Sequence, residues 1–193
     1  MKRTALFFGS FNPIHYGHLN VARAAIETGK IKEVVFIVSP QNPFKRDVDL
    51  LPEQQRLGLV SSVLSREKEM TCNDVEFQLP RPNYTINTLR YLHVLPETNT
   101  HTLLMGADIF IQMKTWQGAA ELLSHDLMIY PREGWQLPEQ SDKIKLLDSP
   151  MISISATLIR QKVEQQEEIN SLVPKEVASF FMRHNLNNIK HAN

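Results

Sequence analysis

The sequence predicts an α/β protein with a doubly wound, mostly parallel sheet and helices on both faces. Short apolar runs of strand length recur along the 193 residues, amphipathic helical stretches separate them, and turn residues follow several of the runs. Successive buried strands joined by helices pair in parallel, with right-handed crossovers. In such open sheets a ligand binds beyond the carboxyl ends of the strands, so candidate functional residues are sought there.

The composition is that of a globular protein, with 42% hydrophobic and 22% charged residues. We expect residues 1–193 to form a single domain, with 150–193 as a C-terminal helical part. Basic and acidic residues number 21 each, so no overall field attracts nucleic acid, and any anion has to be bound by local positive groups. Cys72 cannot form an intramolecular disulfide and is expected to be buried. With no secretory signal pattern and no apolar stretch of transmembrane length, we expect a cytoplasmic protein without membrane contact.

The first strand and helix carry the densest set of candidates. Residues 4–8 predict a buried strand that Gly9 ends, and a helix is expected from Gly17 to about Gly29. His15 and His18 lie at the entrance of this helix, where free backbone amides and the helix dipole favour an anion. The combination indicates phosphate binding. Alternatives are a capping or half-buried histidine, and a metal pair, for which the sequence places no third ligand.

The next elements extend the same pattern. Residues 33–39 predict a second strand, and the loop that follows it carries Lys45, a candidate phosphate ligand if the loop faces the same crevice. Pro52 opens a helix with a buried apolar stripe. We assign Arg56 in this helix to the surface, although it could reach the crevice. A third strand is expected over residues 71–77.

A second helix entrance follows near Tyr84 and Thr85, and it too could receive an anion. The alternatives are capping by Thr85 and packing by Tyr84. Residues 101–105 predict a strand that runs into Asp108, which could accept from ribose hydroxyls, hold a magnesium ion through water or cap the next helix. Trp116 is either a core residue or a flat face for an aromatic ring.

The last part of the chain contains strands predicted at residues 126–131, which lead to Arg132, and at 143–147. Ser155 and Thr157 can cap a helix that extends to about Val163, with Arg160 on its first turns. Hydroxyls, free amides and a guanidinium together suit a phosphate chain. Pro174 begins a final amphipathic helix that is expected to cover the core.

The sequence His15-Tyr16-Gly17-His18 resembles the signature of a nucleotidyltransferase superfamily, namely histidine, any residue, glycine and histidine. Further stretches resemble the bacterial nicotinate-nucleotide adenylyltransferases within that superfamily, in the order found in that family and over most of the chain. These are GSFNPIHYGHL at 9–19, PQNPFK at 40–45, YTINTL at 84–89, GAD at 106–108, Trp116, PREGW at 131–135 and ISATLIR at 154–160.

The resemblance implies a Rossmann-like nucleotidyltransferase sheet and the transfer of AMP from ATP to nicotinate mononucleotide. The products would be deamido-NAD and pyrophosphate, in NAD biosynthesis, with Mg2+ required. The implied partners are ATP and nicotinate mononucleotide, and the resemblance is compatible with a homo-oligomer. It gives no role to nucleic acid or to a membrane.

The resemblance also implies roles for individual residues, none of them a metal ligand. His15, His18, Lys45 and Arg160 would be catalytic. The residues implied to bind ATP are Gly9, Ser10, Phe11, His15, His18, Gly106, Asp108, Ser155, Thr157 and Arg160. The residues implied to bind the mononucleotide are Asn12, Lys45, Tyr84, Thr85, Trp116 and Arg132.

The chain departs from the family pattern at a few positions. Phe8 replaces a frequent glycine, Asn12 and Asn87 replace common aspartates, and Ala156 replaces a serine that could contact phosphate. Neither asparagine can carry the charge of a carboxylate. Other hypotheses are a preference for nicotinamide mononucleotide or for both substrates, a nucleotide sensor without catalysis, and a metal-dependent hydrolase that uses His15 and His18.

Overall fold

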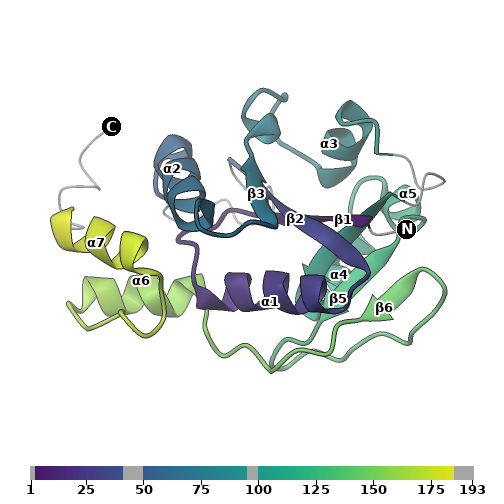
Figure 1. Cartoon of the computed structure of the whole chain (residues 1–193). Coiled ribbons are helices and arrows are strands. Elements are labelled where there is room, and N and C mark those ends of the chain that lie inside the picture. Colours follow the sequence, from purple (N-terminus) through teal and green to yellow (C-terminus); the bar gives the residue numbers. More distant parts are fainter. Residues whose placement is uncertain (1–2, 41–49, 95–99, 185–193) are drawn as a thin grey trace.

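The computed structural model describes residues 3–40, 50–94 and 100–184. Within these residues, six parallel strands form one sheet in the order β3-β2-β1-β4-β5-β6 (Figure 1). The strands are β1 (Arg3–Gly9), β2 (Ile31–Val38), β3 (Met70–Asn73), β4 (His101–Gly106), β5 (Leu127–Tyr130) and β6 (Ile144–Leu146). The predicted doubly wound parallel sheet is therefore confirmed.

Helices join the strands and cover the sheet. They are α1 (Tyr16–Glu27), α2 (Glu53–Leu64), α3 (Thr85–Tyr91), α4 (Ala107–Met113), α5 (Ala119–Leu122), α6 (Ala156–Glu164) and α7 (Lys175–Arg183). A short 3-10 helix, η1 (Val75–Phe77), follows β3. Among the described residues no helix is long and apolar enough to cross a membrane.

Alternate side chains of each strand enter opposite cores, because successive residues of a strand point to opposite faces. Phe7 of β1 belongs to the cluster that also contains buried residues of α1, α2, α6 and α7. Its neighbour Leu6 belongs to a second cluster, with buried residues of α3, α4 and α5. Figure 1 shows α1 and α3 on opposite faces of the sheet. Both faces are thus covered, as in a doubly wound fold.

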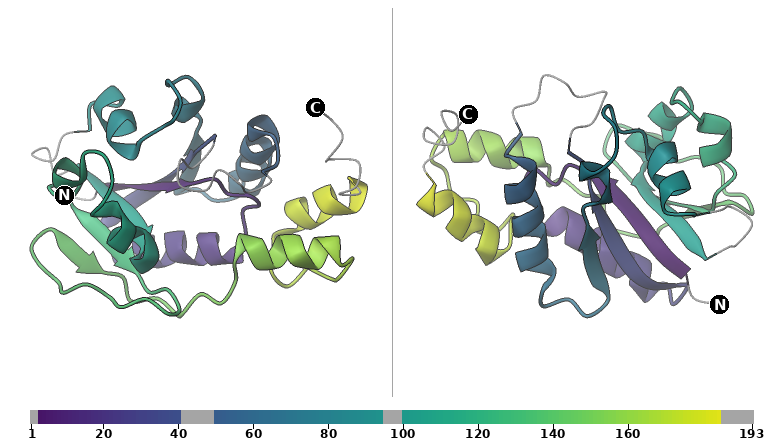
Figure 2. Two further views of the ribbon diagram at one scale, coloured as in Figure 1. Left: turned by 180° about the vertical axis from the view of Figure 1, so that it is seen from behind. Right: turned by 90° about the horizontal axis from the view of Figure 1, so that it is seen from above.

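The two C-terminal helices lie beside each other at one end of the molecule, and α7 packs against α2 (Figure 2). Pro174 occupies the N-cap position of α7, as the sequence predicts. Val177, Ala178 and Phe181 are the buried residues of this helix, so its apolar face does cover the core.

The third strand is shorter than the sequence predicts. Asn73 ends it, because its side-chain oxygen accepts a hydrogen bond of 2.8 Å from the backbone N–H of Val75. This local Asx turn takes the chain out of the sheet and into η1. Cys72, the residue before Asn73, was expected to be buried, but the structure shows it half-buried.

Candidate active site

The predicted site residues gather at the carboxyl ends of β1, β4 and β5, in two adjoining cavities. One, here called the histidine cavity, is lined by His15, His18, Arg132, Ser155 and Arg160, among others. The second, the tryptophan cavity, is lined by residues that include Tyr84, Thr85 and Trp116. The two cavities share Phe7, Phe8, Gly9, Ser10, Ile109 and Tyr130. They are therefore two parts of one cleft at the point where the strand order reverses.

The two histidines of the motif form a stacked pair at the start of α1. Their ring centroids are 3.7 Å apart and the ring planes are inclined by 24°. His15 is the N-cap residue, and its backbone N–H donates to Nδ1 of His18 over 3.3 Å. A neutral His18 therefore carries its proton on Nε2, which can donate to a ligand.

Burial makes both histidines poor bases. Burial first, and then the positive charge of Arg132, together lower the pKa of His15 from 6.5 to about 3. The pKa of His18 also lies well below its usual value, because of burial first and then of His15 and Arg132. Both side chains are neutral near pH 7 in the free protein. They can act there as hydrogen-bond donors, and the positive charge of the cavity comes from its arginines.

Gly17 is needed between the two histidines because they are packed so closely. A Cβ atom at this position would lie 2.9 Å from Nδ1 of His15 and 2.7 Å from Cγ2 of Ile152. Such distances are too short for any side chain. The glycine of the motif thus allows the rings to stack and residue 152 to close over them.

The turn after β1 is held in an unusual conformation. Phe11 has a φ of 46°, in the left-handed region that residues other than glycine seldom adopt. The next residue, Asn12, is buried, and its side-chain oxygen accepts from the backbone N–H of Leu51 over 3.0 Å. From α6, Nη1 of Arg160 donates to the carbonyl oxygen of Asn12 over 2.8 Å. The surrounding structure therefore fixes a turn that would be strained by itself.

The start of α6 brings hydroxyl groups to the same cavity. Ser155 is the N-cap residue, as the sequence predicts, and its hydroxyl accepts from the backbone N–H of Leu158 over 3.1 Å. Thr157 lies inside the helix, and its hydroxyl accepts from Nη2 of Arg160 over 3.2 Å. Capping thus explains Ser155 locally, while Thr157 and Arg160 face the cavity together.

Asp108 and Arg132 lie opposite each other at the ends of β4 and β5. Oδ1 of Asp108 is 3.8 Å from Nε of Arg132, and it is buried without a hydrogen-bond partner. The N-cap of α4 is Gly106, so Asp108 does not cap the helix. A Cβ atom on Gly106 would lie 2.3 Å from Oδ1 of Asp108. Gly106 therefore leaves room for a carboxylate that faces the histidine cavity.

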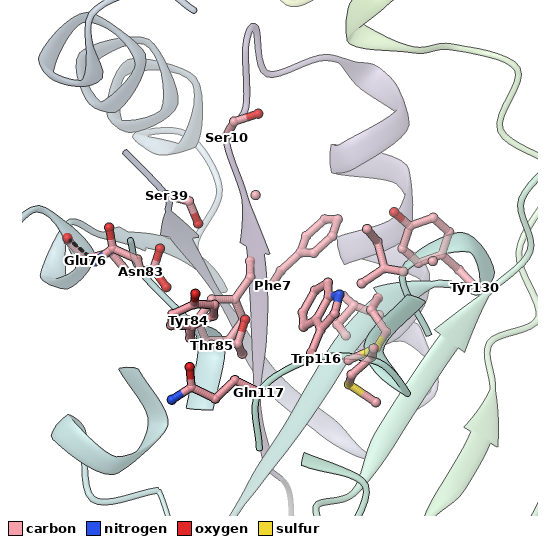
Figure 3. Close-up of a pocket in the computed structure, with 17 residues that line it drawn as sticks. Phe7, Ser10, Ser39, Glu76, Asn83, Tyr84, Thr85, Trp116, Gln117 and Tyr130 are labelled. Carbon is pink, nitrogen blue, oxygen red and sulfur yellow. Dashed lines mark hydrogen bonds between the residues drawn. The ribbon is translucent and has the colours of Figure 1, made fainter. Parts of the chain in front are cut away.

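Trp116 lies in the tryptophan cavity, on the loop after α4. Figure 3 shows Trp116 on one side of the end of β1, and Tyr84 and Thr85 on the other side. The indole is half-buried and packs on the second core cluster. Tyr84 is the N-cap residue of α3 and makes no side-chain capping bond, so it leaves the first amides of this helix uncapped.

A close contact joins the loop of Trp116 to α3. Gly118 has a φ of 75°, and a Cβ atom there would lie 2.8 Å from Cγ1 of Ile86. Only glycine satisfies both the backbone angle and the spacing. Trp116 and the entrance of α3 are thus held in a fixed relation to each other.

The structure places each predicted site residue that it describes in this cleft. Lys45 lies outside the described residues. Arg132 and Asn12, predicted to bind the mononucleotide, line the histidine cavity and not the tryptophan cavity.

Sequence reasoning missed some residues of the cleft. The surface assignment of Arg56 is wrong: the residue is 1% exposed and donates to the backbone carbonyl groups of Ser10 and Ser39, which line the cleft. The spacing of four residues from Arg56 to the buried Val60 was the available signal. Tyr130 lines both cavities, and burial raises the pKa of its hydroxyl. Glu76 lines the tryptophan cavity, where burial raises the pKa of its carboxyl group.

The described residues contain no group of three or more histidine, cysteine or acidic side chains that could hold a metal ion. A Mg2+ ion bound chiefly by nucleotide phosphates and water needs only one or two protein carboxylates. Oδ1 of Asp108, which has no hydrogen-bond partner, fits that requirement. The described part of the site therefore fits a magnesium ion that would arrive with a nucleotide.

A parallel sheet with a histidine and arginine cavity at its switch point defines a nucleotide-binding protein of the nucleotidyltransferase class. A model of the family described as cytidylyltransferase-like matches residues 6–162, and the chain belongs to this family.

Within this family, the chain is similar to curated proteins that share one description. A probable nicotinate-nucleotide adenylyltransferase of Cytophaga hutchinsonii is 37% identical over 188 residues, which covers 93% of this chain and 95% of the relative. The protein of the same description from Bacteroides thetaiotaomicron is 34% identical, over 91% of this chain and 88% of its own. The resemblance stated from the motifs is thus confirmed.

Solved structures share the fold. Plasmodium falciparum nicotinic acid mononucleotide adenylyltransferase, complexed with NaAD, superposes with a TM-score of 0.77 at 18% identity, over 98% of both chains. A putative nicotinate-nucleotide adenylyltransferase of Vibrio parahaemolyticus gives a TM-score of 0.67 at 18% identity, over 97% of this chain and 96% of that one. At this identity the likeness supports the Rossmann-like nucleotidyltransferase fold.

Proposed function

We propose that this protein is an adenylyltransferase that transfers AMP from ATP to nicotinate mononucleotide and forms deamido-NAD and pyrophosphate in NAD biosynthesis. The observation that carries the proposal is the pair of adjoining cavities that share the turn after β1. One offers histidine, arginine and hydroxyl donors to phosphates, and the other offers Trp116 to a ring. The names and coverage of the curated relatives support the same reaction.

The reaction needs positioning more than it needs a base. An oxygen of the mononucleotide phosphate forms a bond to the α-phosphorus of ATP, and the bond from that phosphorus to the oxygen bridging to the β-phosphate breaks. Pyrophosphate leaves with the electron pair. The attacking phosphate has a second pKa of about 6, so much of it is already a dianion at neutral pH. The lowered pKa values of His15 and His18 agree with a mechanism in which neither accepts a proton.

In this proposal His15 and His18 donate hydrogen bonds to the ATP phosphates as charge moves to the departing pyrophosphate. Ser155, Thr157 and Arg160 hold the outer phosphates. The bonds of Arg160 to Asn12 and Thr157 keep its guanidinium beside the cavity until a phosphate competes for it. Lys45, which the structure does not describe, keeps its proposed role as a further phosphate ligand.

The remaining roles follow from the position of each residue. Gly9 to Phe11 form the turn under the nucleotide, and Asp108 accepts from the ribose or holds water around Mg2+, which would neutralise phosphate charge. Trp116 stacks on the pyridine ring. The amides at Tyr84 and Thr85 receive the nicotinate carboxylate. Because Arg132 and Asn12 line the histidine cavity, they are assigned to the mononucleotide phosphate and not to its ring.

Pyrophosphate release, measured with ATP, Mg2+ and each pyridine mononucleotide, tests this function. We expect a higher kcat/KM with nicotinate mononucleotide. A higher kcat/KM with nicotinamide mononucleotide would show that this nucleotide is the substrate. It would also contradict the binding of a nicotinate carboxylate by the amides at Tyr84 and Thr85. Nucleotide binding without turnover on either substrate would support a sensor. A cytoplasmic location belongs to the same proposal and rests on the sequence.

A further inference from the structure

The buried arginine Arg56 lies under the point where the segments after β1 and β2 meet. It projects from α2, and its guanidinium donates hydrogen bonds to four backbone carbonyl oxygens. Nε reaches Leu51 over 2.9 Å, Nη1 reaches Ser10 over 2.6 Å and Ser39 over 2.7 Å, and Nη2 reaches Pro40 over 2.6 Å. One side chain thus joins the start of α2 to the ends of two neighbouring strands.

Among the described residues Arg56 forms no ion pair within 4 Å, although the nearby charge of Glu53 partly offsets the effect of burial on its pKa. Glu53, one turn earlier in α2, pairs with Arg81 over 2.6 Å. Burial lowers the pKa of Arg56 to about 10, so the guanidinium still carries its proton at neutral pH. Desolvating a charge is costly, and apolar side chains of similar volume often stabilise a buried position as well or better. Stability alone therefore gives little reason for an arginine here.

Two of the four carbonyl groups that Arg56 binds belong to residues that line the cavities. Ser10 lines both, and Ser39 lines the tryptophan cavity. The two segments also touch directly, since the backbone N–H of Ser39 donates to the carbonyl oxygen of Gly9 over 2.8 Å. Arg56 therefore sets the spacing between the wall that would face ATP and the wall that would face the mononucleotide.

Arg56 also supports the left-handed residue of the turn. Phe11 has a φ of 46°, and the peptide carbonyl before it, that of Ser10, is bound by Arg56. Arg160 binds the carbonyl of Asn12, the residue that follows Phe11. Two arginines from different helices thus hold the residues on either side of Phe11, which keeps this conformation in the absence of substrate.

We propose that Arg56 is a positioning residue for the adenylyl transfer, which fixes the segments after β1 and β2 so that the two substrates meet in line; this rests on the proposed function. The planar guanidinium is suited to the task because its donors point in fixed directions. Lysine would keep the charge but could not bind all four carbonyl groups at these angles. Geometry and charge can therefore be separated by substitution.

The test compares Arg56→Lys, Arg56→Met and the wild type. Because small misplacements of reacting groups are costly, we expect Arg56→Lys to lower kcat by roughly 10- to 100-fold while the KM for ATP changes little. Arg56→Met should lower kcat similarly and also raise the KM for ATP, because it removes the buried charge. A matched control is Arg66→Lys, since Arg66 is exposed and pairs with Glu176 away from the cleft, and it should retain wild-type constants.

A second measurement does not depend on activity. Hydrogen exchange should show a protected Ser39 amide in the wild type and at least tenfold faster exchange in Arg56→Lys, since the segment that it holds would open locally. Wild-type kcat in Arg56→Lys, or a Ser39 amide in the wild type that exchanges as fast as an open segment, would overturn the proposal. If the wild type releases no pyrophosphate, the proposed function fails, while the exchange result still decides whether Arg56 holds these segments.

Discussion

The imidazole ring of His15 stacks on that of His18, and the backbone N–H of His15 donates to Nδ1 of its partner. This arrangement leaves Nε2 of His18 as the donor and holds the ring in one orientation. A side chain fixed in this way does not have to reorganise when charge develops on a phosphate.

His18→Ala should therefore lower kcat by roughly two to three orders of magnitude, by analogy with the loss of one preorganised donor. Thermal unfolding should show that the variant still folds, because the His18 ring lines the cavity. The control is Asn20→Ala, an exposed position of the same helix, with unchanged kcat. Wild-type turnover in His18→Ala would refute the proposed role.

The lowered pKa of His15 predicts a particular dependence of stability on pH. In the unfolded chain the ring takes up a proton below about pH 6.5, whereas in the folded protein it does so only near pH 3. The unfolded state therefore binds more protons between these values, and folding stability falls as the pH falls through this window. The loss is at most about 1.4 kcal/mol per pH unit for one such group.

Urea unfolding of the wild type and His15→Asn from pH 4 to 7 would measure this effect. The stability advantage of the wild type should shrink as the pH is lowered. NMR titration gives an independent check, since the His15 and His18 rings should not titrate between pH 5 and 8. A parallel pH dependence in the two proteins, or a ring that titrates near pH 6.5, would contradict the assignment of neutral histidines.

Trp116→Ala should mainly weaken binding of the mononucleotide, raising its KM by about tenfold, since an aromatic pair contributes on the order of 1 kcal/mol beyond area burial. The KM for ATP should change much less. Trp135→Ala is the matched control, because Trp135 is 43% exposed. Steady-state kinetics on all three proteins decides the matter, and an unchanged KM in Trp116→Ala would return this indole to a packing role.

Gly106→Ala should displace Asp108, because the added methyl group would lie 2.3 Å from its Oδ1. We expect a loss of stability of about 1–3 kcal/mol from overpacking, together with weaker binding of ATP and Mg2+. Gly58→Ala is a sharp contrast, since a Cβ at that helical position meets nothing within 4 Å. It should stabilise the protein by about 0.5–1 kcal/mol. Thermal unfolding would measure the change in stability of each variant. Calorimetric titration with ATP and Mg2+ would measure the affinity, which should fall only in Gly106→Ala.

The sequence was sufficient for those features that local chemistry determines. The strand before Gly9, the helix after His15 and the cap at Ser155 all follow from residues close together in the chain. The shortening of the third strand was also local, because the turn made by Asn73 ends the strand within the predicted range of 71–77.

The features that sequence reasoning missed depend on long-range contacts. Arg56 was assigned to the surface because its carbonyl partners lie in three separate segments and none of them can be read from side-chain identity. The bond from Arg160 to Asn12 spans 148 positions. The division of the cleft into two cavities likewise depends on how the sheet is ordered and not on any motif.

The order of the strands has a practical consequence. The sheet divides between β1 and β4, with β1 to β3 taken from residues before 94 and β4 to β6 from residues after 100. Each cavity draws on both sides of this seam, Tyr84 with Trp116 in one and His18 with Arg132 in the other. If the chain were divided between α3 and β4, each of the two fragments would lack activity by itself. Turnover would return only when the fragments associate. The rate of turnover would therefore measure how much of the two fragments has associated.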